Sequence, residues 1–359
     1  MKKIIKIISV VVVIVIIVFM ISKSTINDNG IKVGVVLPLT GPVSAVGEDY
    51  KRGMDMAAED YGVKLNYQDG KANPTDSLNA ALQLYNDGNN IIMTAFRGAS
   101  ISVASNFKNK DDVIVFSTTA TSDVKPIGSY GKNFFAIGAE MIQNGFADGT
   151  NASKQCSKVV TLTENTDGGL DKVKGFTQAL GVDKIVMNDT FLTDKNDFKD
   201  VVTKVKSHNP DCIFIEIKSN YFKGFMNQMI EQGISPKVYT TSYSVNKDVA
   251  NSLSDNQKKL VVFSSTSIYP DKTFTNRYFA KYNRYPNDFA LVGYEMVKMM
   301  YENQKECSKN TVKCVSDKLR QVRDRGTYVG KISIDNNQEI KLRDNTLFKI
   351  VGAEFEVVK

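Results

Sequence analysis

The chain has 359 residues, of which 42% are hydrophobic, 24% charged and 9% aromatic. These proportions are those of an ordinary globular protein, and the length favours about two domains over a single core. Residues 1–30 hold four lysines and one aspartate, so they supply much of the formal net charge of +7. The remainder is only mildly basic and shows no basic stripe interleaved with aromatics. We therefore expect no nucleic-acid partner.

The first segment, MKKIIKIISVVVVIVIIVFMISKST, has a basic start followed by an uncharged run from Ile7 to Ser22. This run is at the short limit of a membrane span, which needs ~17–25 residues. No small-residue cleavage site follows it, and no cysteine lies near its end. The pattern favours an uncleaved membrane anchor, with a cleaved signal peptide as the alternative. In either case the lysines stay cytoplasmic and the rest of the chain is extracytoplasmic.

Four cysteines are present, at positions 156, 212, 307 and 314. Disulfides are permitted outside the membrane, and ECSKNTVKC favours a local bridge between Cys307 and Cys314. Four cysteines allow three pairings, and the sequence alone does not choose among them. Their spacing fits no zinc motif, so we expect no metal site.

From residue 31 onward, short apolar runs alternate with stretches of helical periodicity. Such alternation predicts parallel sheets covered by helices. The pattern restarts after Gly149, which indicates two similar α/β lobes in tandem. Helices follow the second lobe, and a β-rich tail closes the chain. The predicted strands are 31–39, 63–69, 90–96, 112–118 and 133–138, then 158–164, 184–191, 212–217, 238–242 and 260–266, with tail strands at 330–337 and 346–358.

Signals for catalysis are weak. The single histidine, His208, is expected on the surface near a helix end, and no nucleophile elbow or His-Glu-x-x-His motif occurs. The loop TGPVSAVG (residues 40–47) lacks the glycine fingerprints of nucleotide sites. It either offers backbone N–H groups to an anion or is a plain connection. We expect a binding protein without a cofactor rather than an enzyme.

Several segments resemble a known family. IKVGVVLPLTGPVSAVGEDYKRGMDMAAED is similar to the start of type I solute-binding proteins, the leucine/isoleucine/valine-binding family of ABC importers. VIVFSTTATS, TENTDGGL and YNRYPNDFALVGYE resemble later segments of that family. The resemblance implies an α/β fold of two doubly wound parallel-sheet lobes joined by a three-crossover hinge, after an N-terminal hydrophobic helix.

The resemblance also implies the boundaries of the parts. The chain would cross between lobes near Ala139, Ser265 and Gly330. Residues 1–30 would form the anchor or signal peptide. The first lobe would comprise 31–138 plus 266–329, and the second lobe 139–265 plus 330–359.

In the family's amino-acid binders, a serine after the third strand and a threonine in an Ala-Thr turn hold the ligand carboxylate. By resemblance, Thr121 keeps the threonine's role and Thr119 supplies backbone contacts. Gly98 takes the serine's place with a backbone donor only, and Ser100 is a substitute hydroxyl. Arg97 either forks onto a ligand carboxylate or pairs with an acid on the rim.

The second lobe departs from the family pattern. Ser242 or Tyr243 takes the place of the glutamate that binds a ligand ammonium. Asp167 either recovers that contact or caps the next helix. Lys218 also falls near the ligand by resemblance, and together with Arg97 it would make the site cationic. An anionic or strongly polar ligand is therefore favoured over a neutral branched-chain amino acid.

The resulting functional hypothesis is an extracytoplasmic solute-binding protein. It would act as a monomer, capture a small polar ligand (an amino acid, carboxylate or amide) between its lobes, and deliver it to an ABC permease. The alternative is the ligand-sensing module of a signalling or chemotaxis receptor system.

Overall fold

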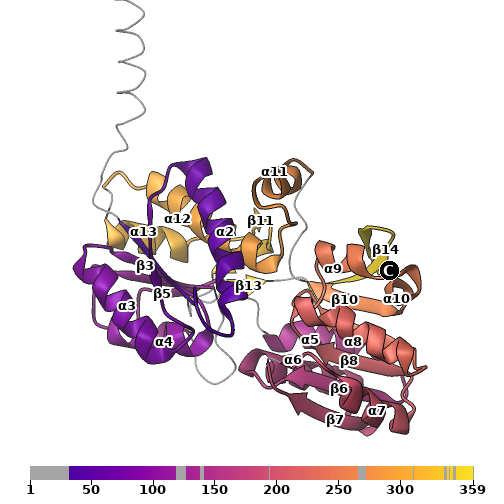
Figure 1. Cartoon of the computed structure of the whole chain (residues 1–359). Helices are drawn as coiled ribbons and strands as arrows, with labels where there is room; N and C mark the ends of the chain where they lie inside the picture. The colour runs from indigo at the N-terminus through magenta and orange to yellow at the C-terminus, as the bar shows by residue number, and fades with distance from the viewer. Residues whose placement is uncertain are drawn as a thin grey trace, which may run out of the picture.

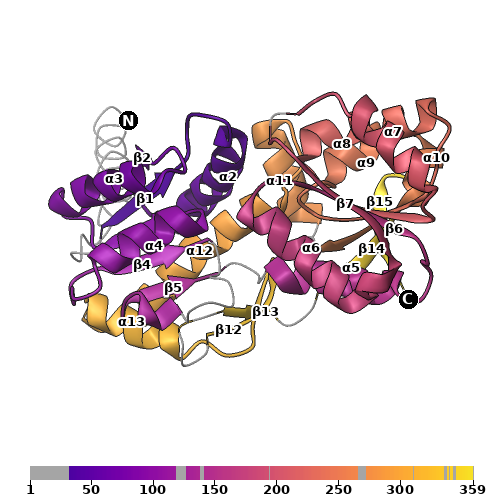
Figure 2. The ribbon, with the colours of Figure 1, turned by 90° about the horizontal axis from the view of Figure 1, so that it is seen from below.

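The computed structural model describes residues 32–118, 127–137, 141–193, 195–265, 272–309, 311–334, 338, 340–342 and 345–358. Two α/β lobes lie side by side in Figures 1 and 2, and each is built on its own sheet. The predicted fold class is confirmed for these lobes. The hydrophobic segment at the N-terminus lies outside the described residues.

The first lobe has a five-stranded parallel sheet with the order β2-β1-β3-β4-β5. Neighbouring residues on β1 point to opposite faces: Val35 packs in the core under α2 and α12, and Val36 in the core under α3 and α4. Both faces of the sheet are therefore covered, as parallel sheets require. The elements are β1 (Val33–Leu37), α2 (Ser44–Tyr61), β2 (Leu65–Asp69), α3 (Pro74–Asn86), β3 (Ile91–Thr94), α4 (Arg97–Asn106), β4 (Ile114–Ser117), η1 (Ile127–Ser129), β5 (Phe134–Ala136), α11 (Lys272–Tyr282), α12 (Asp288–Lys305) and α13 (Val312–Arg320).

The second lobe has a seven-stranded sheet with the order β15-β14-β10-β9-β8-β6-β7. Strands β6 to β10 pair in parallel, and the tail strands β14 and β15 add an antiparallel edge beside β10. Helices α5 and α6 cover one face and α7, α8 and α9 the other. The elements are α5 (Met141–Ala152), β6 (Val159–Glu164), α6 (Asp167–Leu180), η2 (Val182–Lys184), β7 (Ile185–Phe191), α7 (Lys199–His208), β8 (Cys212–Glu216), α8 (Ser219–Glu231), β9 (Lys237–Thr241), α9 (Lys247–Ser252), α10 (Asp255–Leu260), β10 (Val261–Ser265), β14 (Thr346–Val351) and β15 (Glu354–Val357).

One helix pair in each lobe depends on close backbone contact. A Cβ atom on Gly53 of α2 would lie 1.8 Å from the carbonyl oxygen of Ala290 on α12. A Cβ atom on Gly145 of α5 would lie 1.8 Å from the carbonyl oxygen of Lys172 on α6. Only glycine allows these approaches. The contact at Gly145 fixes the position of α6 against α5. Helix α6 carries several charged residues of the candidate site.

The third crossing between the lobes comes later than expected. A small sheet of β11 (Arg325–Thr327), β12 (Gly330–Ile334) and β13 (Ile340–Leu342) precedes it. Ile332 and Ile334 of β12 are fully buried in the core of the first lobe. The boundary expected at Gly330 is therefore wrong, because these apolar side chains belong to the first lobe and the chain returns to the second lobe only at β14. The crossing expected near Ala139 lies outside the described residues.

Within the described part of the chain, no helix has the length and apolar character needed to cross a membrane.

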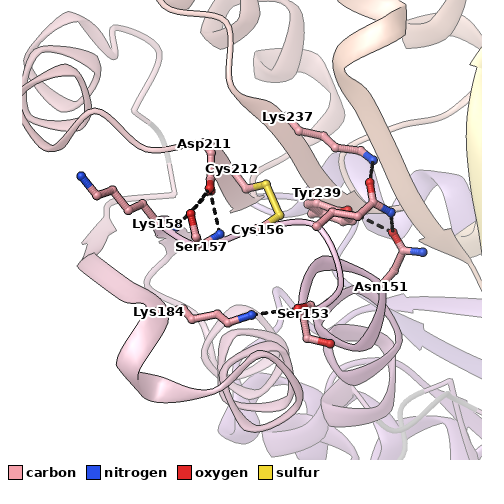
Figure 3. The surroundings of a disulfide bond; sticks show 11 residues. Asn151, Ser153, Cys156, Ser157, Lys158, Lys184, Asp211, Cys212, Lys237 and Tyr239 are labelled. Atoms are coloured by element: carbon pink, nitrogen blue, oxygen red, sulfur yellow. Dashed lines mark hydrogen bonds between the residues drawn. A yellow bond between two sulfur atoms is a disulfide. The ribbon is translucent and has the colours of Figure 1, made fainter.

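Two disulfides join the four cysteines. The favoured bridge between Cys307 and Cys314 is present, and a second bridge joins Cys156, after α5, to Cys212 at the start of β8. Figure 3 shows this second bridge beside Asp211, whose carboxylate accepts hydrogen bonds from Ser157 and from the backbone N–H of Lys158. Both sulfur atoms near Asp211 are used by the disulfide, so no thiolate is left there for a metal.

The two disulfides should differ in their effect on stability. Cys156 and Cys212 are 56 residues apart, whereas Cys307 and Cys314 are 7 apart. By restricting the entropy of the unfolded chain, the disulfide that closes the longer loop should add about 4 kcal/mol to the unfolding free energy, and the one that closes the shorter loop about 2 kcal/mol. We expect the Cys156→Ala/Cys212→Ala variant to lose more unfolding free energy than the Cys307→Ala/Cys314→Ala variant. Urea unfolding of both double variants checks this, and the opposite order would contradict it.

Candidate functional site

Each lobe has a point where the order of its parallel strands reverses. In the first lobe it lies between β1 and β3, and in the second between β6 and β8. In open α/β sheets, ligands bind beside the carboxyl ends of the strands at such points. The two edges are in direct contact: Nζ of Lys218, after β8, lies 3.4 Å from the carbonyl oxygen of Pro42, after β1.

The loop after β1 is fixed by Asp69 at the end of β2. The Asp69 carboxylate accepts the backbone N–H of Leu39 at 2.9 Å and the hydroxyl of Thr40 at 2.5 Å. The Thr40 hydroxyl is therefore already used within the lobe. Helix α2 begins after Val43, and no side chain caps it.

Arg97 opens α4, directly after β3. The preceding residue, Phe96, has a φ of 66°, a strained value for a bulky side chain that turns the chain sharply into the helix. A terminal nitrogen of Arg97 donates to the carboxylate of Asp171 on α6 at 2.6 Å. Of the two uses expected for Arg97, the structure shows the ion pair, and its partner comes from the other lobe.

The remaining predicted residues of the first lobe differ in accessibility. Gly98 is exposed at the start of α4. The hydroxyl of Ser100 is buried and bonded to Thr94 at 2.9 Å and to Ser117 at 2.8 Å, so it joins β3 and β4 rather than pointing outward. Thr119 and Thr121 lie outside the described residues.

On the second lobe, Glu164 links the ends of three strands. Its carboxylate accepts the backbone N–H of Lys218 at 3.1 Å and the hydroxyl of Tyr243 at 3.0 Å. Burial raises the pKa of Glu164 above its ordinary value, although both hydrogen bonds oppose that shift. The Lys218 ammonium also donates to the carbonyl oxygen of Thr193 at 2.7 Å.

Behind Glu164 lies a buried ion pair that sequence reasoning missed. Lys172 of α6 donates to Glu216 at the end of β8, and the hydroxyl of Thr241 donates to the same carboxylate at 2.9 Å. The Lys172 ammonium also lies 5.0 Å from the centre of the Tyr243 ring. Burial raises the pKa of Glu216, against the opposing charge of Lys172. The sequence did hold a signal for this cluster. An acidic residue ends each of the two strands that flank the reversal point: Glu164 ends β6 and Glu216 ends β8.

A second buried acid, Asp148 of α5, has no charged hydrogen-bond partner among the described residues. Its carboxyl accepts from the Ser264 hydroxyl at 2.5 Å. Burial raises its pKa well above the ordinary value, against the Ser264 hydrogen bond, and the Glu216 charge adds to the rise. Its other oxygen and Oδ1 of Asn144, one helical turn earlier, are both buried without a partner in the described part of the chain. A proton on Asp148 would give this pair of acceptors a donor.

Further contacts join α12 of the first lobe to the second lobe. The carboxylate of Asp288 accepts from the hydroxyl of Ser242 and, at 3.2 Å, from that of Ser265. The Tyr243 ring meets the ring of Phe289 edge-on, with centroids 6.0 Å apart. Ser242 and Tyr243, both predicted, are thus brought to the contact between the lobes.

Two other sequence expectations concern helix ends. Thr166, rather than Asp167, caps α6, because its side chain accepts from the backbone N–H of Gly169. Asp167 is exposed in the first turn. His208 is exposed at the end of α7, as expected.

The charges of the described residues do not make a cationic site. Arg97 is paired with Asp171, and the ammonium of Lys218 is bonded to two carbonyl oxygens. Glu164 and Asp288 lie at the same contact between the lobes. The expectation of a cationic site is therefore wrong for the described residues. Arg97 and Lys218 each already have a partner.

The comparisons with known proteins agree with the fold. The family model described as periplasmic binding protein matches residues 30–352. The chain therefore belongs to the periplasmic binding protein family, whose members are binding proteins rather than enzymes and are extracytoplasmic. This confirms the resemblance seen in the sequence.

Individual relatives are distant. A Leu/Ile/Val-binding protein homolog of Brucella melitensis is 26% identical over 196 residues, which are 51% of this chain and 53% of the relative. A Leu/Ile/Val-binding protein of Rhizobium johnstonii is 24% identical over 202 residues, again 51% of this chain and 53% of the relative. The chain thus matches about half the length of these curated relatives.

Solved structures match nearly the whole fold. A solute-binding protein of an ABC transporter from Rhodopseudomonas palustris BisB5, in complex with 3,4-dihydroxybenzoic acid, has a TM-score of 0.78 at 22% identity, covering 91% of this chain and 95% of its own. The branched-chain amino acid transporter substrate-binding protein of Streptococcus pneumoniae, in complex with isoleucine, has a TM-score of 0.76 at 20% identity, covering 91% and 99%. At these identities the likeness shows the fold.

The raised pKa of Asp148 predicts a stability that depends on pH. Because the folded state holds the proton more tightly than the unfolded state, this contribution is full below about pH 4 and is lost as pH rises through the folded pKa. Asn at this position stays neutral and keeps a donor. We expect Asp148→Asn to raise the unfolding free energy at pH 8 by at least about 1 kcal/mol and to change it little at pH 4.

Urea unfolding at several pH values measures this difference. Asp255→Asn, at an exposed position in the first turn of α10, is the matched control and should show a small change without such a pH slope. A difference between Asp148→Asn and the parent that is constant from pH 4 to pH 8 would contradict the assignment.

Proposed function

We propose that this periplasmic binding protein captures a small polar ligand between its two lobes and presents it to an ABC permease. The observation that carries the proposal is the contact of the two strand-reversal edges through Lys218 and Pro42. In each lobe, this edge is the position at which open α/β sheets bind ligands. A ligand placed between the two edges would therefore contact both lobes.

Among polar ligands, we propose an amino acid or a related carboxylate or amide. On the first lobe, the exposed start of α4 at Gly98 offers backbone N–H groups of an uncapped helix, which favour a carboxylate. Thr119 and Thr121 are proposed to complete that subsite, as the family resemblance implies. At the contact between the lobes, the carboxylates of Asp288 and Glu164 would favour a positive or hydrogen-donating group.

Ligand binding would work by stabilising the lobes in contact. The hydrogen bonds and ring contacts between Asp288 or Phe289 and the second lobe form only when the lobes meet. A ligand that touches both lobes adds its binding energy to the same state, so it shifts the population toward closure. The permease would then distinguish the closed form from the open one.

The N-terminal 30 residues are proposed to hold the protein at the outer surface of the membrane. Their lysines and apolar run fit an uncleaved anchor. The alternative is a cleaved signal peptide, which would release the protein instead of anchoring it. In both forms the lobes are extracytoplasmic, where their two disulfides persist.

The first test is thermal unfolding of the full chain against amino acids, carboxylates, amides and sugars. The chain has no tryptophan, so a dye or calorimetry is needed in place of intrinsic fluorescence. A ligand at 100 times its dissociation constant should add about 2.7 kcal/mol to the unfolding free energy. A shift with amino acids or related acids and amides supports the proposal, and no shift with any of them would overturn it.

A variant of Asp288 tests the role of lobe contact. Asp288→Asn keeps the size of the side chain but removes the charge that strengthens the bonds from Ser242 and Ser265. We expect ligand affinity to fall by about 1–3 kcal/mol, because the closed state loses charge-assisted bonds. Isothermal titration of the ligand found in the panel measures the loss.

The control is Asp76→Asn. Asp76 also lies in the first turn of a helix of the first lobe, α3, but it is partly exposed and its ion-pair partner is Lys71 of the same lobe. This change alters the charge at a helix N-terminus without touching the other lobe, so affinity should stay unchanged. Equal losses from both variants would show that Asp288 acts only through the charge at its helix.

A further inference from the structure

The pairing of Arg97 with Asp171 has a consequence for ligand choice. The two side chains come from opposite lobes, α4 and α6, and each is only 19% exposed. Their contact is therefore shielded from solvent far more than an ordinary surface ion pair. A ligand that contacts Arg97 therefore meets a guanidinium whose charge is already balanced by Asp171.

Arg97 nevertheless keeps one donor without an acceptor. Its Nε–H is buried and has no hydrogen-bond partner among the described residues, while a terminal nitrogen is taken by Asp171. A buried donor left unpaired is costly, so an acceptor from a bound molecule would be favoured there. Arg97 opens α4, whose start is the carboxylate subsite proposed above, so this acceptor would belong to the same ligand.

We propose that Asp171 is a specificity-determining residue, which makes Arg97 accept a neutral oxygen of the ligand and reject a second carboxylate. This inference rests on the proposed function. An oxygen bonded to Nε shares the guanidinium with the Asp171 carboxylate. A neutral amide or hydroxyl oxygen accepts the bond without penalty, whereas an anionic group is repelled by Asp171 in a partly desolvated place.

The same helix supplies a matched control. Asp167 lies one turn before Asp171 on α6 and is exposed. Removing its charge changes the net charge of the lobe by the same amount but leaves the ion pair with Arg97 intact. The effect of Asp171 on ligand choice is thereby separated from the effect of overall charge.

The experiment compares amide and acid partners of otherwise equal shape. The probes are L-glutamine with L-glutamate, L-asparagine with L-aspartate, and the monoamide of terephthalate with terephthalate. Their dissociation constants are measured by calorimetry for the parent chain and for Asp171→Asn, Asp171→Ser, Asp167→Asn and Arg97→Lys. Two substitutions at Asp171 guard against poor folding of either one.

For the pair that binds, the parent should favour the amide by at least about tenfold. Asp171→Asn and Asp171→Ser should reduce or invert this ratio by about tenfold, and Asp167→Asn should leave it within about twofold. Arg97→Lys, which keeps the charge but lacks Nε–H, should weaken the amide partner.

Each contrary outcome has a distinct meaning. If Asp171→Asn weakens both members of a pair equally, the ion pair serves closure only and the inference is overturned while the proposed function stands. The same holds if Asp167→Asn shifts the ratio as much as Asp171→Asn does. If no probe binds any of the five chains, the inference is overturned, and the wider ligand panel decides separately on the proposed function.

Discussion

A parallel sheet must be covered by helices on both faces, and this constraint decides where either lobe can bind anything. The cores beneath α2 and α12, and beneath α3 and α4, consume both faces of the first sheet. The cores beneath α5 and α6, and beneath α7 and α8, do the same in the second. Only the strand ends and their loops remain for recognition. The two lobes meet at those ends, so contact between them and contact with a ligand occur in the same region.

The cost of burying a charge explains how the charged groups near the contact between the lobes are arranged. Lys172 and Glu216 neutralise one another in the interior, since either charge alone would be costly to bury. For Asp148 the cost of burying a charge is avoided in another way, because its raised pKa favours the neutral form. Nearer the other lobe, Arg97 is neutralised only when Asp171 approaches from across the gap. These interior groups are therefore balanced or neutral within the second lobe itself, whereas the charge of Arg97 is balanced only by lobe contact.

Local sequence patterns predicted most of the fold. The strands came from short β-branched runs, and the start of α3 from Asn73-Pro74, where the Asn73 side chain does cap the helix. The third crossing was placed too early by resemblance, and the alternation of Ile332 and Ile334, as in any half-buried strand, could not correct it. Alternation shows that one face of a strand is buried, but it does not show which lobe buries it. That depends on contacts between residues far apart in the sequence.

The candidate site was harder to predict for the same reason. Resemblance predicted that Arg97, Ser242 and Tyr243 lie between the lobes, and they lie at the contact between the lobes, but their partners are remote: Asp171 is 74 residues from Arg97, and Asp288 is 46 residues from Ser242. Resemblance placed the charges of Arg97 and Lys218 together and so predicted a cationic site, but it could not predict the partners that each of them has. The charge that a ligand meets is set by pairs that form across the lobes. Specificity in this architecture accordingly belongs to the closed state as a whole, and a residue such as Asp171 can influence it through Arg97 without any bond of its own to the ligand.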